Sequence, residues 1–329
     1  MNALKQLGNN ALRWFDSEAE STETVSIRTT STEEDEALVN KATNRKVNWQ
    51  RIIPFFAVHL TCLCVFFVGW SPAAILVCLA MFWLRMFAIT AFYHRYFSHR
   101  SFKTNRFWQF VFAVIGASAA QRGPLWWASH HRKHHQHSDE FNDLHSPKNG
   151  FWWSHMGWFT CEEAFKTDYG VIKDWTEFPE LRFINRFDIL IPFLLATSLF
   201  IVGELLYAYA PSLETNGWQM LIWGFFISTV ALAHATFTIN SLCHTWGSRR
   251  FETKDDSRNN PWLAFLTLGE GWHNNHHRYA ISARQGFYWW EVDISYFILK
   301  FLSWFGIVYD LRPVPKNILK EGRDNDKHQ

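Results

Sequence analysis

Four apolar stretches approach the length that a helix needs to cross a lipid bilayer. They cover residues 52–70, 72–92, 188–210 and 218–241. A bilayer core requires roughly 20 apolar residues per helix, so each stretch predicts one membrane span. Short turns, from Gly69 to Pro72 and from Pro211 to Gly217, separate the two members of each pair. The pattern predicts an all-α integral membrane protein with four transmembrane helices in two hairpins.

A fifth apolar segment, from Phe107 to Ala120, is shorter than these four. We expect it to be interfacial or re-entrant and not to cross the bilayer. If it crossed, the histidines before and after it would lie on opposite sides of the membrane, and they could not share a metal site.

Lysine and arginine are absent from the two turns within the hairpins, whereas the other connections are basic. The positive-inside rule therefore places both termini and the long connection from Tyr93 to Arg186 in the cytosol. Residues 1–48 are rich in Ser, Thr, Glu and Asp, and they predict a disordered cytosolic tail. Residues 49–315 form the predicted functional domain, and 316–329 form a polar C-terminal tail.

Composition supports the membrane assignment and excludes some functions. The chain has 31 Phe and 19 Trp, and aromatic residues of this kind gather at lipid interfaces. A net charge of +2 gives no indication of a nucleic-acid partner. The five cysteines have neither ferredoxin-like nor zinc-ribbon spacing, so they predict no iron–sulfur centre and no disulfide framework.

Histidines form three clusters in the polar connections. They are HRYFSH (His94, His99), HRKHH (His131, His134, His135) and HNNHH (His273, His276, His277). Positions i, i+3 and i+4 of a helix share one face, so the second and third clusters can each direct three rings to one place. An i, i+5 pair diverges on a straight α-helix. We therefore expect His94 at the end of the second span and His99 beyond a break.

The topology, derived without reference to histidine, places all three clusters on the cytosolic side, together with His244 just after the fourth span. Neutral imidazoles suit iron, copper, nickel or zinc. Eight or nine ligands are too many for one ion, so two adjacent metals are expected. Carboxylates must orient such rings, and nearby candidates are Asp139, Glu140, Asp256 and Glu270. The other histidines are interpreted as packing residues: His59, His130, His137, His145, His155 and His234.

At these residues the chain resembles the membrane-bound fatty acid desaturase family, in its acyl-CoA (stearoyl-CoA type) Δ9 branch. The resemblance covers about residues 50 to 315. It includes HRYFSH, HRKHH, SHMGW at 154–158, NSLCH at 240–244 and the long stretch GEGWHNNHHRYAISARQGFYWWEVD. It implies four spans capped by a cytosolic helical domain that holds two iron ions, and it makes 49–315 a desaturase domain.

The resemblance also implies roles for individual residues. One iron would be bound by His94, His99, His131, His135 and His276, and the other by His134, His244, His273 and His277. Asn240 corresponds to a position that reaches the second iron through water. Gln121, Trp127 and Thr236 resemble residues lining a bent acyl tunnel, and Phe237 replaces an expected Trp. No catalytic residue is expected beyond the metal centre.

The chain departs from the animal acyl-CoA pattern where the headgroup should bind. Ser129-His130 and Glu162-Glu163 replace an Arg-Asp pair and an Arg-Lys pair. Acids repel the phosphates of coenzyme A, so CoA bound in that mode is disfavoured. A phospholipid-borne or carrier-borne acyl chain is an alternative, as is CoA bound by other residues such as Arg122, Lys148 or Lys166.

The predicted function is oxygen-dependent desaturation that introduces a cis double bond, at Δ9 by resemblance, into a saturated acyl chain. An unactivated C–H bond offers no acidic proton, so a metal–oxygen oxidant is needed. The sequence has no HPGG-like cytochrome b5 segment, flavin fingerprint or cysteine-ligated cluster. An external electron donor of the cytochrome b5 or ferredoxin type, with its reductase, is therefore expected.

Three other functions are weighed against this one. The nearest is a di-iron membrane hydroxylase of alkyl or acyl chains, which product analysis would separate. A metal transporter would require ionisable ligands within the spans, where only His59, Arg85, Glu204 and His234 occur. A structural zinc protein of the membrane would differ in metal identity and redox behaviour.

Overall fold

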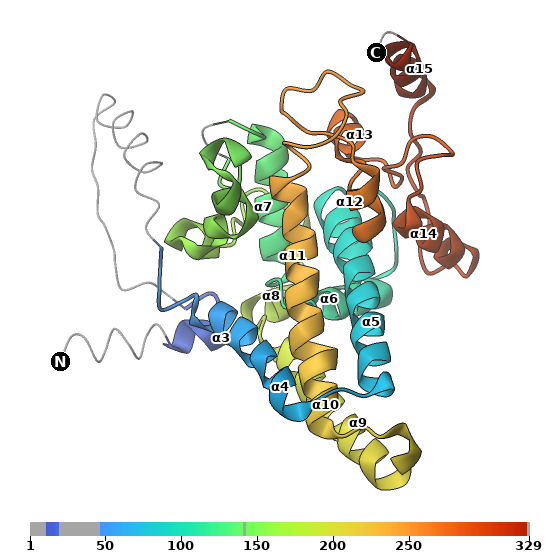
Figure 1. The fold of residues 1–329 in the computed structure, drawn as a ribbon. Helices are drawn as coiled ribbons and strands as arrows, with labels where there is room; N and C mark the ends of the chain where they lie inside the picture. Colours follow the sequence, from blue (N-terminus) through green and yellow to red (C-terminus); the bar gives the residue numbers. More distant parts are fainter. Residues whose placement is uncertain (1–10, 20–46, 141–142, 328–329) are drawn as a thin grey trace, which may run out of the picture.

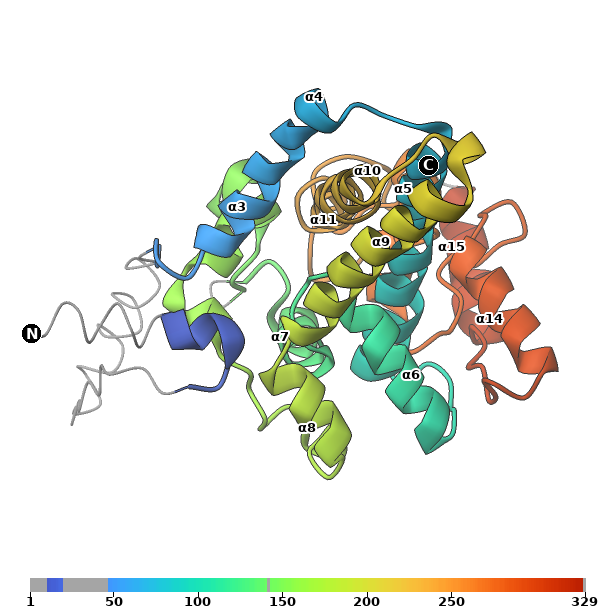
Figure 2. The same ribbon diagram turned by 90° about the horizontal axis from the view of Figure 1, so that it is seen from below.

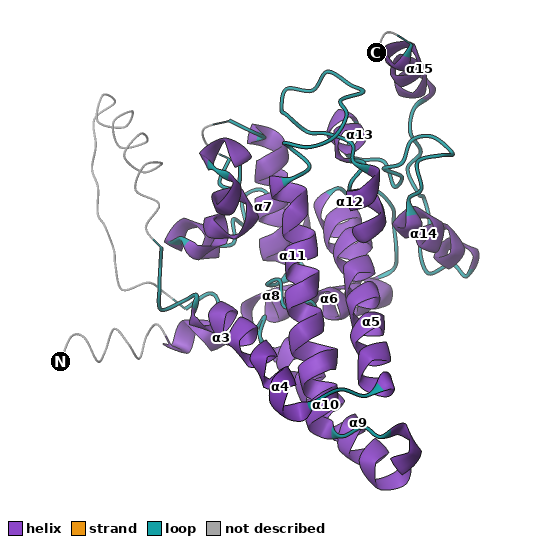
Figure 3. Ribbon diagram, in the orientation of Figure 1, coloured by secondary structure: helices purple, strands orange, loops and turns teal. Residues whose placement is uncertain are grey.

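The computed structural model describes residues 11–19, 47–140 and 143–327. Within these ranges every regular element is a helix, and the loops contribute only isolated β-bridges (Figure 3). This confirms the all-α prediction for the described part of the chain. Most of the predicted tail 1–48 lies outside the described residues, so its disorder stays a prediction.

Three helices are long and apolar enough to cross a membrane, at the places where the second, third and fourth spans are predicted. The first runs from Pro72 to Ser98 and combines α5 (Pro72–Phe87) with the π-helix η2 (Ala88–Ser98). The second is α9 (Leu190–Tyr209). The third runs from Gly217 to Ser241 through α10 (Gly217–Leu221), η9 (Ile222–Ile227) and α11 (Ser228–Ser241).

The first predicted span is also helical, but it is shorter. It comprises α3 (Ile53–Thr61), η1 (Cys62–Cys64) and α4 (Val65–Val68). Its 16 residues would span about 24 Å, less than the roughly 30 Å of a bilayer core. It ends at Gly69, whose φ of 67° favours glycine. The ambiguous segment near Phe107 forms α6 (Arg106–Ala117), about 18 Å long, which is too short to cross.

The remaining helices are short or lie in the polar connections. They are α7 (Pro124–His137), η3 (Pro147–Asn149), η4 (Trp153–Gly157), η5 (Trp158–Thr160), η6 (Glu162–Phe165), η7 (Lys173–Trp175), α8 (Pro179–Arg186), η8 (Pro211–Leu213), α12 (Pro261–Leu266), α13 (His273–Arg278), α14 (Ile294–Trp304) and α15 (Lys316–Asp326). The last of these lies within the predicted polar C-terminal tail.

The apolar helices and the histidine-bearing helices occupy opposite ends of the molecule. In Figure 1, α4, α10 and one end of α9 gather at the lower end, and α11 and α5 rise from there. Helices α7 and α13 lie at the upper end. Figure 2, seen from below, shows α10 and α11 nearly end-on, with α3 and α4 on one side and α9 crossing on the other. The fold therefore separates an apolar half from a half that carries the histidine clusters.

The core surrounds the π-helix η2, all of whose residues are buried. Its Phe92 ring stacks on Phe112 of α6, with centroids 3.9 Å apart. Close packing continues at Gly116 of α6, where an added Cβ would lie 2.1 Å from the Tyr93 ring. The segment that carries His94 and His99 is therefore packed on all sides, which fixes the position of these two residues.

Candidate metal centre

The π-helix η2 determines how the first histidine cluster is arranged. Its hydrogen bonds run from residue i to i+5, as in the bond from the His99 backbone N–H to the His94 carbonyl at 3.2 Å. Each residue then turns less than in an α-helix, so His94 and His99 face the same side and their ring centroids lie 4.9 Å apart. His99 lies just past the helix end, as expected, but the π-helix aligns the pair and no break intervenes between them.

Five imidazoles converge beside the end of this helix. His94 and His99 meet His131 and His135 from α7 and His276 from α13, and one ligand nitrogen from each lies within 4.8 Å of all the others. The Nε2 atoms face one another: His99 and His131 are 2.8 Å apart, and His276 is 2.8 Å from His135 and 3.0 Å from His94.

Four further imidazoles form a second group next to the first. They are His134 from α7, His244 just after α11, and His273 and His277 from α13, again with ligand nitrogens within 4.8 Å of one another. The Nε2 atoms of His244 and His273 are 3.0 Å apart. These two groups divide the nine histidines as the family resemblance implies.

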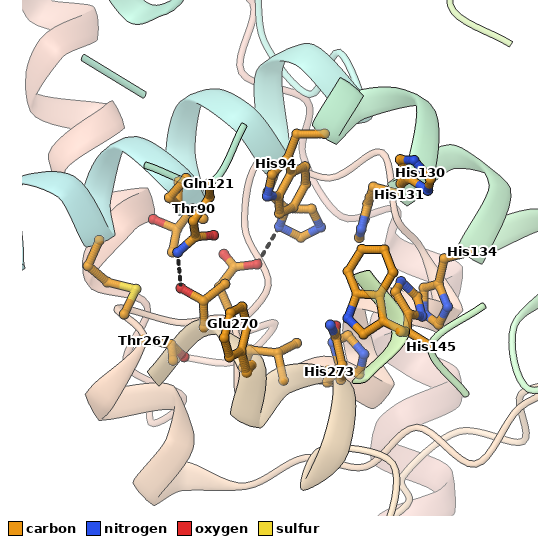
Figure 4. A pocket seen from close by; sticks show the side chains of 18 of the residues that line it. Thr90, His94, Gln121, His130, His131, His134, His145, Thr267, Glu270 and His273 are labelled. Carbon is orange, nitrogen blue, oxygen red and sulfur yellow. Dashed lines mark hydrogen bonds and ion pairs between the residues drawn. The ribbon is translucent and has the colours of Figure 1, made fainter. Parts of the chain in front are cut away.

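Carboxylates bind the Nδ1 atoms of several of these rings, on the side of the ring away from the facing Nε2 atoms. His134 Nδ1–H donates to Asp143 at 2.9 Å, His244 Nδ1–H to Asp139 at 2.8 Å and His277 Nδ1–H to Asp255 at 2.6 Å. His94 Nδ1 is paired in the same way with Glu270 (Figure 4). A proton held on Nδ1 leaves the Nε2 lone pair free and aimed at the centre, which is how metal-binding histidines are oriented.

The facing nitrogens fit a bound cation and do not fit hydrogen bonding alone. His276 Nε2 faces two nitrogens, and a proton on it could satisfy only one of these contacts. His94 has its Nδ1 paired with Glu270, so its Nε2 presents a lone pair to His276. One of the two contacts of His276 is therefore repulsive unless a positive ion lies between the rings. An all-nitrogen donor set of neutral imidazoles suits iron, copper, nickel or zinc and does not suit magnesium or calcium.

Burial keeps these rings in the form that binds metal. It lowers the pKa of His134 to about 3 and holds the pKa values of other ring members well below the ordinary range, so the rings are neutral near pH 7. The members so affected are His99, His131, His135, His273 and His276.

A small cavity of about 80 Å³ lies against both histidine groups (Figure 4). Its lining includes the predicted substrate residues, Gln121, Trp127, Thr236 and Phe237, and also Asn240. Gln121 Nε2–H donates to Thr236 Oγ1 at 3.0 Å, which joins the loop after α6 to α11. Trp127 stacks on His131, with ring centroids 5.0 Å apart. The structure thus brings the predicted substrate residues together beside the histidines.

A larger cavity of about 430 Å³ adjoins the small one, and we call it the entrance cavity. The two cavities share Gln121, Trp126, Trp158 and Phe237 in their linings. An elongated apolar molecule that entered the larger cavity would therefore be directed past these four residues toward the histidines.

The sequence identified only some of the orienting carboxylates. Asp139 and Glu270 orient His244 and His94, as expected. Glu140 pairs instead with the exposed ring of His137. Asp255, and not its neighbour Asp256, orients His277. Asp143 was missed, and it also lies 2.9 Å from His145 Nδ1. The position of Asp143 in the sequence, eight residues after His135, was the only signal that it could contact a histidine of α7.

Comparisons with known proteins agree with this geometry. The family model described as fatty acid desaturase matches residues 43–299. An sn-1 stearoyl-lipid 9-desaturase from Anabaena variabilis is 34% identical over 278 residues, which cover 84% of this chain and 97% of the relative. A Delta-9 acyl-lipid desaturase from Arabidopsis thaliana is 40% identical over 274 residues, covering 80% and 85%.

A third relative uses a different acyl carrier by its name. It is an acyl-CoA 5-desaturase from Anemone leveillei, 34% identical over 301 residues that cover 85% of this chain and 87% of the relative. Relatives named for lipid-bound and for CoA-bound substrates therefore match to a similar degree. The family match and these identities over most of the chain, together with two histidine groups beside an apolar cavity, show that the chain belongs to the fatty acid desaturase family and is an oxidoreductase.

Proposed function

We propose that the protein introduces a cis double bond at Δ9 of a saturated fatty acyl chain, using O₂ and two iron ions. The observation that carries the proposal is the convergence of nine imidazoles, in two adjacent groups, beside a cavity that adjoins a larger, mostly apolar one. The Δ9 position follows the names of two of the relatives.

One iron ion would be held by His94, His99, His131, His135 and His276, and the other by His134, His244, His273 and His277. Asn240 lines the same cavity and would reach the second ion through water. Bound there, the two ions would supply, with O₂, an oxidant strong enough to remove hydrogen from an unactivated methylene.

The protein itself positions the chain and keeps the site dry. The acyl chain would pass the residues that line both cavities, which are Gln121, Trp126, Trp158 and Phe237. The hydrogen bond between Gln121 and Thr236 would fix the width of the passage there. A bent passage presents one methylene pair to the centre and selects the cis product. Aromatic walls at Trp127 and Phe237 exclude water that would otherwise consume the oxidant.

Each turnover needs electrons from outside. Desaturation removes two hydrogens from the chain, and O₂ with two electrons and two protons then yields two molecules of water. A separate donor of the cytochrome b5 or ferredoxin type, served by its reductase, would supply the electrons at the face that carries the histidine-bearing helices.

The membrane arrangement completes the proposal. Four spans, the three long apolar helices and the shorter Ile53–Val68 helix, would form two hairpins, with both termini and the metal centre in the cytosol. The basic connections between hairpins support this orientation.

The test is expression in a host that lacks its own desaturase, with iron and a donor system supplied, followed by mass spectrometry of membrane fatty acids. A cis-monoene with its double bond at carbon 9 is expected. It should disappear in His135→Ala and persist in His137→Ala, a matched control on the same helix whose exposed ring pairs with Glu140. A hydroxylated product would instead indicate a membrane hydroxylase.

A further inference from the structure

Three arginines lie together at one end of the entrance cavity. Arg13 comes from the helical segment 11–15, Arg51 directly precedes α3, and Arg122 lies between α6 and α7, and all three line the cavity. We call them the arginine cluster. The Arg51 guanidinium carbon lies 3.9 Å from the centre of the Phe165 ring, and that of Arg122 lies 5.7 Å from it. Segments far apart in the sequence thus bring positive charge to one place.

Two acids lie among these arginines but do not neutralise them. Glu162 binds Arg13 and lies 3.8 Å from Arg51, and Asp188 lies 3.2 Å from Arg122 Nε. Three positive and two negative side chains leave one positive charge. Arg13 and Arg51 are only 7% and 6% exposed, and an uncompensated charge is costly at such sites.

The cluster also has hydrogen-bond donors to spare. In the described part of the chain, two buried guanidinium nitrogens of the cluster, Nε of Arg13 and Nη2 of Arg51, have no hydrogen-bond partner. Nε of Arg122 makes no hydrogen bond there either, but it lies 3.2 Å from Oδ2 of Asp188. Buried donors are normally satisfied, so unpaired N–H groups from Arg13 and Arg51, which line one cavity, indicate a missing acceptor. Burial and the charges of Arg122 and Arg13 lower the pKa of Arg51 to about 9, which is the effect expected where cations outnumber anions.

The rest of the cavity is mostly apolar and belongs to the membrane half. Its wall includes Phe55 and Val58 from α3, Pro192 and Phe193 from α9, and Phe226 from η9. Phe193 is 64% exposed, so this wall reaches the apolar outer surface of α9. A molecule that fits would have one anionic group for the arginines and an apolar part that enters from the bilayer side.

We propose that the arginine cluster binds the phosphodiester of a membrane glycerophospholipid, whose acyl chain lies in the entrance cavity and extends to the metal centre. The proposal rests on the proposed function, because it names the acyl carrier for that site. A phosphodiester carries one negative charge and several acceptor oxygens, which match one surplus positive charge and the two free donors of Arg13 and Arg51. Arginine binds phosphate with charge-assisted, often bidentate, hydrogen bonds.

Coenzyme A fits this cluster less well. Its several phosphates would bring more negative charge than the cluster can balance, and they would meet Glu162, whose side chain is 35% exposed at the outer edge. The deep burial of Arg13 and Arg51 also leaves little room for a nucleotide.

The test compares binding of a phospholipid with binding of acyl lipids that lack its phosphodiester. The full-length protein in detergent micelles would be titrated with tritiated dioctanoyl-phosphatidylglycerol, and dioctanoylglycerol, stearoyl-CoA and stearate would be used as competitors. Binding does not require the metal, so it is read independently of activity. We expect the phospholipid to bind at least tenfold more tightly than each competitor, and Arg51→Gln and Arg122→Gln to weaken it roughly tenfold each.

Two further variants separate loss of binding from misfolding. Asp188→Asn removes one negative charge from the cluster and should tighten phospholipid binding several-fold, which an unfolded protein could not show. Arg106→Gln changes an exposed arginine that pairs with Glu180 on the protein surface, and it should leave binding unchanged. Equal binding of dioctanoylglycerol, tighter binding of stearoyl-CoA or stearate, or no effect of the arginine variants would overturn the proposal.

An activity measurement distinguishes the two proposals. If the iron-loaded protein desaturates stearoyl-CoA but no phospholipid, and Arg51→Gln does not alter the rate, the function stands and the phospholipid site is wrong. If no substrate is desaturated, the proposed function fails, and the binding results still decide whether the cluster recognises phosphate.

Discussion

His244 donates its Nδ1–H to Asp139 Oδ2 at 2.8 Å, and the backbone N–H of Asp256 donates to the same oxygen at 2.8 Å. Asp139 thus joins the end of α7 to the loop that follows α11, and it sets the direction of one imidazole. Its φ of 58° is one that asparagine tolerates, which makes a conservative substitution possible.

Asp139→Asn should therefore weaken metal binding without unfolding the protein. The neutral amide orients His244 less firmly and makes it a weaker ligand, and changes of this kind typically cost 10- to 100-fold in metal affinity. The measurement is metal content after dialysis against increasing chelator. Glu140→Gln, at an exposed site one residue away, is the control. Equal metal retention in both variants would contradict the assigned role of Asp139.

Gly116→Ala should destabilise the core around the π-helix. The new Cβ would lie 2.1 Å from the Tyr93 ring, which is fully buried and cannot move aside. Overpacking of this kind costs about 1–3 kcal/mol, so the thermal unfolding midpoint should fall by several degrees. Gly170→Ala is a matched control, because its Cβ meets only the Asp168 carboxylate, at 3.0 Å. An unchanged midpoint for Gly116→Ala would show that η2 is less tightly packed than described.

Thr236→Val should broaden the position of the double bond. Valine keeps the shape of the side chain but cannot accept the hydrogen bond from Gln121, so the passage loses one constraint worth roughly 1 kcal/mol. The minor positional isomers should increase roughly fivefold, as measured by mass spectrometry of the monoenes. Thr238→Val serves as the control, since the Thr238 hydroxyl donates to Ala235 of its own helix. An unaltered isomer distribution would remove Thr236 from the substrate passage.

The helical segment 11–15 should detach in acid. Although burial alone would raise the pKa of Glu162, hydrogen bonds from Arg13 and Asn48 and the charges of Arg13 and Arg51 lower it below 4.5. A carboxyl whose folded pKa is depressed adds stability above its unfolded pKa, and this stability is lost as pH falls through the lower, folded pKa. Amide exchange of residues 11–19, corrected for the intrinsic rate, should therefore rise below pH 4.5.

A pair of variants checks the cause of this acid response. Glu162→Gln should show fast exchange of residues 11–19 already at neutral pH, because the ion pair with Arg13 is absent. Glu163→Gln, at the exposed neighbouring position, should behave like the unaltered protein. If both variants exchange alike, the segment is held by contacts other than Glu162.

The sequence was most informative about features that depend on residues close together in the chain. Apolar length predicted three long helices close to their observed bounds. Histidine spacing on α7 and α13 predicted that the three rings of each helix meet at one place, whereas the structure divides the rings of both helices between the two groups. The pairing of His94 with His99 was harder, because a π-helix depends on packing against α6 and leaves no clear mark in the composition. The i, i+5 spacing of the two histidines was the available signal, since it matches the hydrogen-bond step of a π-helix.

Contacts between distant segments could not be predicted in this way. Asp255 orients His277 and its neighbour Asp256 does not, and only the path of the loop decides between adjacent residues of the same type. The arginine cluster is a stronger case. Arg13 falls within a segment whose composition predicts disorder, yet its charge is buried against Glu162, some 149 positions along the chain.

The two histidine groups have a consequence for the life of the protein in the cell. Each group draws its rings from three places in the chain: the first from η2, α7 and α13, and the second from α7, the loop after α11 and α13. A bound ion therefore cross-links segments that packing and hydrogen bonds already hold together, and its binding energy adds to the stability of the folded state. Metal shortage would then reduce the number of molecules that survive proteolysis, so that metal supply would control how much of this enzyme a cell keeps as well as how fast each copy works.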